Sequence, residues 1–271
     1  MRKILLSIIC LSLSVLAISQ TASECFEAGN SKLSLHDYVG AITDFTKAIE
    51  LYPENPFPYH LRGISKMALD DNIGAMLDYS KAIELNPEND RYYFYRGLVK
   101  SSLKDYMGAI ADYTKAIELN PKNADAVYYY SRGLIKPLLK DYMGAIADFT
   151  KAIELNPKNA NYYYNRGMSK VDLEDKIGAM LDYSKAIELN PKDDGCYFCR
   201  GLVKSSLKDY RGAINDYNEA IELNPKDADY YYQRALSKLS LDQKNSGCLD
   251  LSKAGELGNV EAYDIIKKYC Q

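Results

Sequence analysis

The stretch MGAIADYTKAIELNP, residues 107–121, decides the fold because the chain repeats it throughout its length. The related stretches end at Pro53, Pro87, Pro121, Pro157, Pro191, Pro225 and, in a degenerate copy, Asn259. Successive ends are separated by 34, 34, 36, 34, 34 and 34 residues. Such a period is typical of a solenoid, in which no single copy buries its apolar side chains alone. The sequence therefore predicts a row of equivalent units that offers a surface for partners.

Each copy predicts two helices. In residues 90–123 the first is expected over YYFYRGLVKSSL, and the second over MGAIADYTKAIEL after the short step KDY. Apolar residues of the second helix recur at three- and four-residue steps, which is helical rather than alternating spacing. Pro121 ends it, because proline cannot continue a helix and restrains the residue before it.

A glycine recurs within the predicted first helices. The column contains Gly29, Gly63, Gly97, Gly133, Gly167 and Gly201, with Ala235 in the last copy. A mid-helix glycine costs about 0.5–1 kcal/mol relative to alanine. Its recurrence indicates that the two helices of each copy pack closely.

Charged residues recur in three further columns. They are Arg62, Arg96, Arg132, Arg166, Arg200 and Arg234; Lys32, Lys66, Lys100, Lys136, Lys170, Lys204 and Lys238; and Asp44, Asp78, Asp112, Asp148, Asp182, Asp216 and Asp250. An arginine and a lysine four residues apart share one helix face, and the aspartate lies on the opposing helix. We interpret the columns as inter-helix ion pairs; a phosphate or acidic-ligand site is the alternative.

The recurring glycine, the pair Ala109 and Ala116, Tyr113 between them and the closing Pro121 together resemble tetratricopeptide repeats. The resemblance covers Ala22 to about Asn259 and implies an all-α, right-handed superhelical solenoid of helix-turn-helix repeats. The seven repeats are expected at residues 22–55, 56–89, 90–123, 126–159, 160–193, 194–227 and 228–259. The chain departs from the family pattern where Arg replaces the usual Leu before the glycine, and where Lys replaces the usual Tyr three residues after it.

A longer period lies above the short one. The segment from Gly63 resembles the segment from Gly167, and that from Gly97 resembles that from Gly201, each 104 residues further along. A block of three repeats was therefore duplicated. The fourth repeat carries two extra residues and Pro137 inside its first helix, which predicts a kink or an early end to that helix.

The two ends of the chain differ from the repeats. Arg2 and Lys3, the apolar stretch 4–17 and the small residues of Ala17-Ile18-Ser19 are typical of a cleaved signal peptide over residues 1–19. An uncleaved anchor is the alternative, although the stretch is short for a membrane span. A signal peptide would place the mature protein outside the cytoplasm, in the periplasm, the envelope or the medium. Residues 260–271 predict a helix that caps the last repeat.

Five cysteines follow the predicted signal peptide. Cys248 and Cys270 lie at similar distances on either side of a turn at Gly258, so an antiparallel hairpin brings them level, and we expect a disulfide between them. The pairing of Cys25, Cys196 and Cys199 stays open. The Cys-x-x-Cys motif at Cys196 lies in a predicted repeat helix, outside the usual redox context.

Motifs for chemistry are scarce. His36 and His60 fall in different repeats, and neither a metal-ligand pattern, a nucleophile with its base nor a glycine-rich phosphate loop is evident. We therefore expect no enzyme, cofactor or metal. The 34 basic and 37 acidic residues form no basic run longer than two, which argues against a nucleic-acid partner.

The resemblance also implies which residues contact a partner. Columns at matching places of the first helices line the concave groove of tetratricopeptide proteins, which receives extended peptides. Here they contain His60, Phe94, Tyr130, Tyr164, Phe198 and Tyr232, followed four residues later by Ile64, Leu98, Leu134, Met168, Leu202 and Leu236. Packing between helices is the alternative interpretation. The basic and amide residues that clamp a C-terminal carboxylate are missing.

The expected function is a scaffold or adaptor that binds protein or peptide segments in this groove, without a stable membrane span after signal cleavage. Two alternatives remain. One is a structural protein that self-assembles through its repeat faces. The other is a glycan-binding surface that uses the 25 tyrosines, although the absence of tryptophan argues against it.

Overall fold

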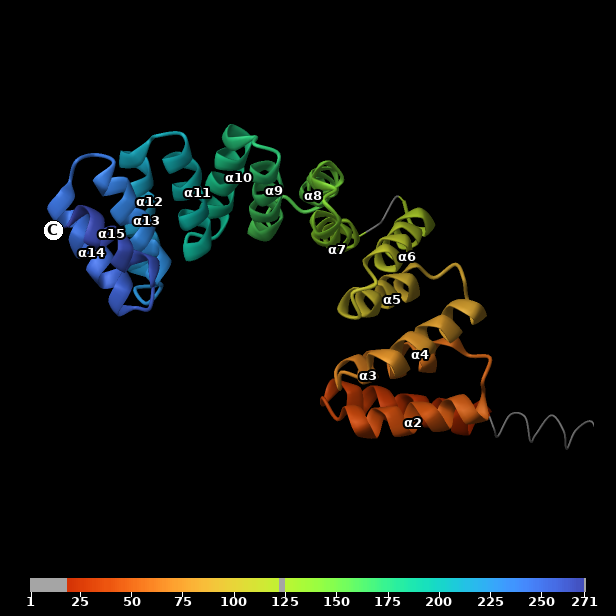
Figure 1. The fold of residues 1–271 in the computed structure, drawn as a ribbon. Coiled ribbons are helices and arrows are strands. Elements are labelled where there is room, and N and C mark those ends of the chain that lie inside the picture. Colours follow the sequence, from red (N-terminus) through yellow and green to blue (C-terminus); the bar gives the residue numbers. More distant parts are fainter. Residues whose placement is uncertain (1–18, 122–124, 271) are drawn as a thin grey trace, which may run out of the picture. The chain divides into compact units, whose positions relative to one another are not determined.

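The computed structural model describes residues 19–121 and 125–270, and in these residues every regular element is a helix (Figure 1). This confirms the predicted all-α class. The chain divides into two compact units, residues 1–135 and 136–271. The predicted signal peptide lies, apart from Ser19, outside the described residues. None of the helices described has the length and apolar character needed to cross a membrane.

The first unit begins with a helix over residues 19–34. It continues with α2 (Tyr38–Leu51), α3 (Pro56–Met67), α4 (Asn72–Leu85), α5 (Asp90–Ser102), α6 (Tyr106–Leu119) and α7 (Ala126–Ile135). Consecutive helices pack against each other, so the unit consists of helical hairpins.

The second unit begins with η1 (Lys136–Leu139), a 3₁₀ turn. It continues with α8 (Tyr142–Leu155), α9 (Ala160–Asp172), α10 (Lys176–Leu189), α11 (Asp194–Ser206), α12 (Tyr210–Leu223), α13 (Ala228–Leu239), α14 (Lys244–Glu256) and α15 (Glu261–Tyr269). As Pro137 predicts, α7 ends early, at Ile135, and the 3₁₀ turn follows it.

The turn inside each hairpin is built the same way. After α5, the Asp105 N–H donates to the Lys100 carbonyl at 2.8 Å, and Lys104 takes a left-handed conformation with φ 63°. Asp105 then caps α6, because its Oδ1 accepts from the N–H of Gly108 at 3.0 Å. A Cβ at Gly108 would meet Asp105 Oδ2, so another residue here would make the capping side chain shift. The Asp-x-x-Gly pattern recurs at five other turns and fixes where the second helices begin.

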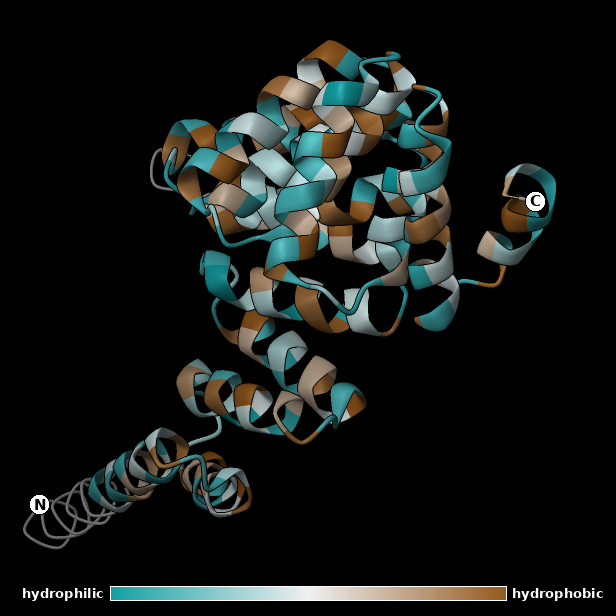
Figure 2. Cartoon of the chain, turned by 90° about the vertical axis from the view of Figure 1, so that its left-hand side faces the viewer, coloured by the Kyte–Doolittle hydropathy of each residue, from teal (hydrophilic) through white to brown (hydrophobic). Residues whose placement is uncertain are grey.

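The two helices of a hairpin touch at the recurring glycine. A Cβ at Gly97 would lie 2.7 Å from the Tyr113 ring of the opposing helix, which is too close for any other residue. Tyr113, Ala109 and Ala116 are at most 1% exposed. Hydrophobic and hydrophilic residues are mixed along the helices (Figure 2). The predicted close packing is confirmed.

The recurring arginines at positions 62, 96, 166, 200 and 234 each join three helices. Arg96 donates through Nε and Nη2 to the carboxylate of Asp112 on its own second helix, at 2.9 and 2.8 Å. Its Nη1 donates to Ser80 Oγ of the preceding second helix at 3.3 Å, and the guanidinium lies 5.7 Å from the centre of the Tyr93 ring. The same bonds recur at Arg62, Arg166, Arg200 and Arg234. The predicted inter-helix ion pairs are therefore confirmed, and the bond to the preceding repeat is an additional finding.

The C-terminal helix α15 packs on the last hairpin. Ala262 is fully buried with Ala235, Leu251 and Ala254. A disulfide joins Cys248 of α14 to Cys270, with their Cα atoms 5.8 Å apart. The covalent bond therefore holds α15 against the apolar end of the second unit.

Candidate partner-binding face

The first helices of neighbouring repeats lie next to one another within each unit. Contacts join α3 with α5 and α5 with α7 in the first unit, and α11 with α13 in the second. The residues expected to line a groove lie on these helices and on α9, so they share one face in each unit. We call this the first-helix face.

The aromatic members of this face differ in burial. His60 and Phe94 are each only 8% exposed. The His60 ring lies 5.0 Å from the rings of Tyr92 and Tyr95, and Phe94 stacks on Tyr128 at 4.6 Å. These two rings therefore take part in helix packing. Tyr130, Tyr164, Phe198 and Tyr232 are half-buried.

The aliphatic members are more open. Met168 is 45% exposed and Leu134 is 39% exposed, whereas Ile64, Leu98, Leu202 and Leu236 are half-buried. Partly open apolar side chains on adjacent helices are the arrangement that can receive apolar side chains of a peptide.

A mainly apolar hollow of this face lies in the second unit, between α9 and α11. It has a volume of about 410 Å³, which falls in the range of about 300–1,000 Å³ typical of ligand pockets. Its lining residues are Met168, Val171, Asp172, Lys176, Tyr183, Cys199, Leu202, Val203 and Ser206. Sequence analysis predicted Met168 and Leu202 here but not the part played by Cys199.

The two cysteines of the Cys-x-x-Cys motif are free thiols that occupy different environments. Cys196 is fully buried, whereas Cys199 is half-buried and its Sγ lies 3.6 Å from the hydroxyl of Tyr164. Burial raises the pKa of both thiols, that of Cys196 to about 12. Both are therefore protonated at neutral pH, which makes them poor nucleophiles.

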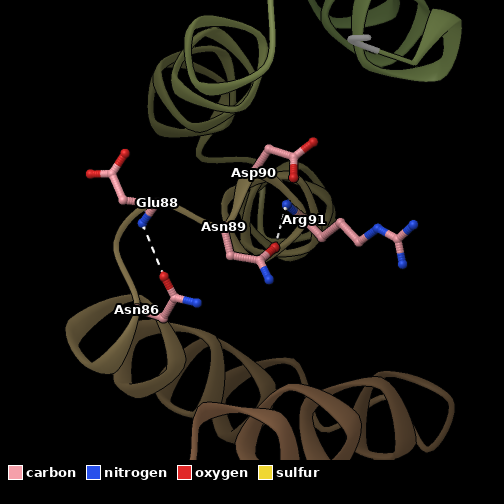
Figure 3. Close-up of a pocket in the computed structure, with 5 residues that line it drawn as sticks. All are labelled: Asn86, Glu88, Asn89, Asp90 and Arg91. Carbon is pink, nitrogen blue, oxygen red and sulfur yellow. Dashed lines mark hydrogen bonds between the residues drawn. The ribbon is translucent and has the colours of Figure 1, made fainter.

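A second hollow, of about 370 Å³, lies at the loop between α4 and α5 (Figure 3). Its polar side chains already serve the backbone: Asn86 Oδ1 accepts from the N–H of Glu88 at 3.3 Å, and Asn89 Oδ1 accepts from the N–H of Arg91 at 3.1 Å. These bonds form the turn and the N-cap of α5. We therefore assign this hollow to the fold.

Exposed apolar residues also lie on the second helices, a feature that sequence analysis missed. In the first unit they are Val39, Ile73, Leu77 and Met107, and in the second Met143, Ile177, Leu181 and Leu249, each 56–72% exposed. The signal was visible in the sequence, because most of these positions recur with the repeat period. In the described part of the chain, no three His, Cys, Asp or Glu side chains gather as a metal site would require.

Comparisons with protein families agree with this architecture. A family model described as "TPR repeat" matches residues 138–170 and 204–241. Two models described as "Tetratricopeptide repeat" match residues 91–123 and 160–193. No curated protein sequence matches the chain.

Solved structures show the same fold. A tetratricopeptide repeat protein from Parabacteroides merdae is 23% identical with a TM-score of 0.64, and the match covers 93% of this chain and 100% of that one. YrrB, whose structure is described as a TPR protein with an unusual peptide-binding site, is 22% identical with a TM-score of 0.60, over 67% and 92% of the two chains. MamA from Desulfovibrio magneticus is 23% identical with a TM-score of 0.60, over 64% and 97%. With its repeated hairpins, its glycine contacts and these matches, the chain belongs to the tetratricopeptide repeat family.

Proposed function

We propose that this chain is a non-enzymatic scaffold outside the cytoplasm that binds extended protein or peptide segments along the first-helix face. The tetratricopeptide repeat fold indicates a protein-interaction scaffold. The observation that carries the proposal is the set of open or half-buried aliphatic side chains on adjacent first helices, with Met168 45% exposed above an apolar hollow. YrrB, which shares the fold, is described by its own peptide-binding site.

A peptide library displayed on phage tests the binding. Wild-type protein is expected to enrich a set of related peptide sequences. The double variant Leu202→Lys with Leu236→Lys is expected not to bind these peptides. Leu181→Lys is the matched control, because Leu181 is 65% exposed on a second helix. Absence of enrichment, or equal loss in the control, would contradict binding at the first-helix face.

The location outside the cytoplasm rests on the signal-like residues 1–19. We expect the exported protein to begin at about Gln20. N-terminal sequencing of the exported product measures this directly, and a membrane-bound product that retains Met1 would overturn the proposal.

Self-association is a second candidate, because the apolar residues of the second helices are exposed. Leu77 and Leu181, which are 104 residues apart, are 64% and 65% exposed. Sedimentation at several concentrations should then show an average mass that rises with protein concentration. The double variant Leu77→Lys with Leu181→Lys should show a lower mass at the same concentrations. A constant monomer mass would exclude this role.

A further inference from the structure

The hollow between α9 and α11 has a counterpart in the same chain. Its lining residues Met168, Val171, Tyr183 and Cys199 correspond to Ile64, Met67, Tyr79 and Tyr95, each 104 residues earlier in the duplicated block. The two sites thus derive from one ancestral sequence. The largest change in side-chain size is at Cys199, which stands where the earlier copy has Tyr95, and Asp172 and Lys176 stand where it has Ala68 and Asn72.

The earlier copy has an aromatic ring at the position of Cys199. Tyr95, like Ile64 and Met67, packs against the buried cluster around Tyr79, and its ring stacks on Tyr79 with centroids 5.8 Å apart and planes inclined by 22°. The Tyr95 ring therefore covers Tyr79, the residue that corresponds to the floor of the later hollow.

In the later copy the ring is missing. Cys199 has a much smaller side chain, and Met168 and Val171 are 45% and 40% exposed, whereas Ile64 and Met67 are half-buried. Tyr183 stays in place as the buried floor, 2% exposed. The 410 Å³ hollow therefore borders the position at which the sister copy carries a tyrosine ring, and Tyr164, which stands where the sister copy has His60, directs its hydroxyl to Cys199.

The rim supplies polar groups to such a ring. Asp172, Lys176 and Ser206 line the hollow together with the apolar wall. A phenol has an apolar ring and a hydroxyl that both donates and accepts hydrogen bonds. The carboxylate, the ammonium group and the hydroxyl around an apolar floor can bond the phenol hydroxyl while the floor contacts its ring. Because the two charges are opposite, they favour neither an acidic nor a basic side chain of a peptide.

We propose that this hollow binds an aromatic side chain, preferably tyrosine, of the partner peptide, which takes the place that Tyr95 holds in the earlier copy. The inference rests on the proposed function, because it names the anchor residue of the peptide that the first-helix face receives. Buried aromatic anchors tend to dominate the binding energy of such interfaces. A peptide with Tyr or Phe at the anchor position should be preferred over one with Lys or Gly there.

The first test uses N-acetyl-tyrosinamide as the probe and methionine methyl groups labelled with carbon-13 as reporters. The Met168 methyl resonance should move upfield on titration, because a ring in the hollow lies against its side chain. Met143, which is 69% exposed on α8, is the internal control and should not move. N-acetyl-alaninamide should move neither. A Met168 resonance that the tyrosine probe does not move would overturn the inference.

The second test fills the hollow with the residue of the sister copy. Cys199→Tyr restores the residue of the sister copy, and its ring must displace the Tyr164 hydroxyl, which lies 3.6 Å from Cys199 Sγ where the sister copy has His60, so its melting temperature is measured first. The variant should abolish the change that the tyrosine probe causes in the Met168 resonance. It should also bind the selected peptides with an affinity about tenfold lower or more, as the loss of a central anchor does. Cys199→Ser leaves the hollow open and should retain both responses. Met168→Ala, which removes an exposed wall, should weaken the same peptides if Cys199→Tyr does not fold.

The outcomes separate the two proposals. Selected peptides that bind Cys199→Tyr as tightly as wild type would overturn the anchor site and leave the scaffold function intact. Failure of the wild-type protein to select any peptide would overturn the scaffold function, and with it the anchor role of the hollow.

Discussion

Arg96 and Asp112 face each other across a hairpin and share two parallel hydrogen bonds, of 2.9 and 2.8 Å. Lys100 adds a third contact to the same carboxylate at 2.8 Å, and the Asp112 side chain is only 6% exposed. Such a bidentate pair is more rigid than a single ionic contact. The guanidinium also reaches Ser80 of the preceding repeat.

Replacing this arginine should be costly. We expect Arg96→Ala to lower the free energy of unfolding by about 3 kcal/mol, because the buried carboxylate loses its main partner. Lys115→Ala, an exposed position on the same α6, should change it by less than about 0.5 kcal/mol. Urea unfolding followed by circular dichroism measures both. Equal effects in the two variants would show that the pair contributes little.

His60 should make the stability depend on pH. Burial, with a smaller effect of Arg91, lowers the pKa of His60 from 6.5 to about 4. Between these values the unfolded chain takes up a proton that the folded chain does not. Above pH 6.5 the protonation of His60 therefore does not reduce the free energy of unfolding. As the pH falls from 6.5 towards 4, the free energy of unfolding decreases by up to about 3 kcal/mol.

His60→Phe, which introduces the residue found at Phe94 and Phe198, removes this titration. The free energy of unfolding in urea is measured for wild type and variant at about pH 7 and about pH 4.5. The difference between the two proteins separates the titration of His60 from that of the carboxylates, which both proteins share. The same difference at both pH values would contradict a buried neutral His60.

Phe94 should behave as a core residue. Its ring is 8% exposed and stacks on Tyr128 at 4.6 Å. Phe94→Ala is expected to cost about 3–5 kcal/mol and to lower the melting temperature sharply. Phe57→Ala, at a ring that is 52% exposed, is the matched control. A Phe94→Ala protein with unchanged melting temperature would assign this ring to partner contact instead.

The disulfide of α15 should act locally. Its bond closes a separation of 22 residues, so Cys270→Ser should lower stability by about 3 kcal/mol. Hydrogen exchange should quicken in α15 and at the apolar side of α14, while the first unit stays unchanged. Cys25→Ser, which removes a free thiol, is the control. Exchange that stays slow throughout α15 in the Cys270→Ser protein would show that packing alone holds the helix.

Local patterns in the sequence predicted the hairpins well, because each boundary depends on nearby residues. Pro121 and Pro137 restrict their own backbone, and Gly97 leaves room for Tyr113 sixteen residues later. Within one repeat, spacing alone brings these groups together. The all-α fold and the ion pairs could therefore be derived before any coordinates.

Features that depend on neighbouring repeats could not be derived this way. His60 and Tyr164 occupy the same column, yet the first is buried by Tyr95 and the second faces Cys199. Which of these applies depends on a residue in the next repeat, and on how the two repeats stack. For the same reason the column pattern could not separate packing rings from open ones or reveal the hollow beside Met168.

The arginine contacts also bear on how such a chain changes length. The guanidinium groups of Arg62 and Arg166 each bind an aspartate and lie over a tyrosine ring of their own repeat, and each donates to a small polar side chain, Thr46 or Thr150, of the preceding repeat. Removing or adding one whole 34-residue copy inside a unit therefore recreates a junction of the same chemistry. Repeat number becomes a property that evolution or an engineer can vary in steps, which sets the length of the first-helix face within a unit.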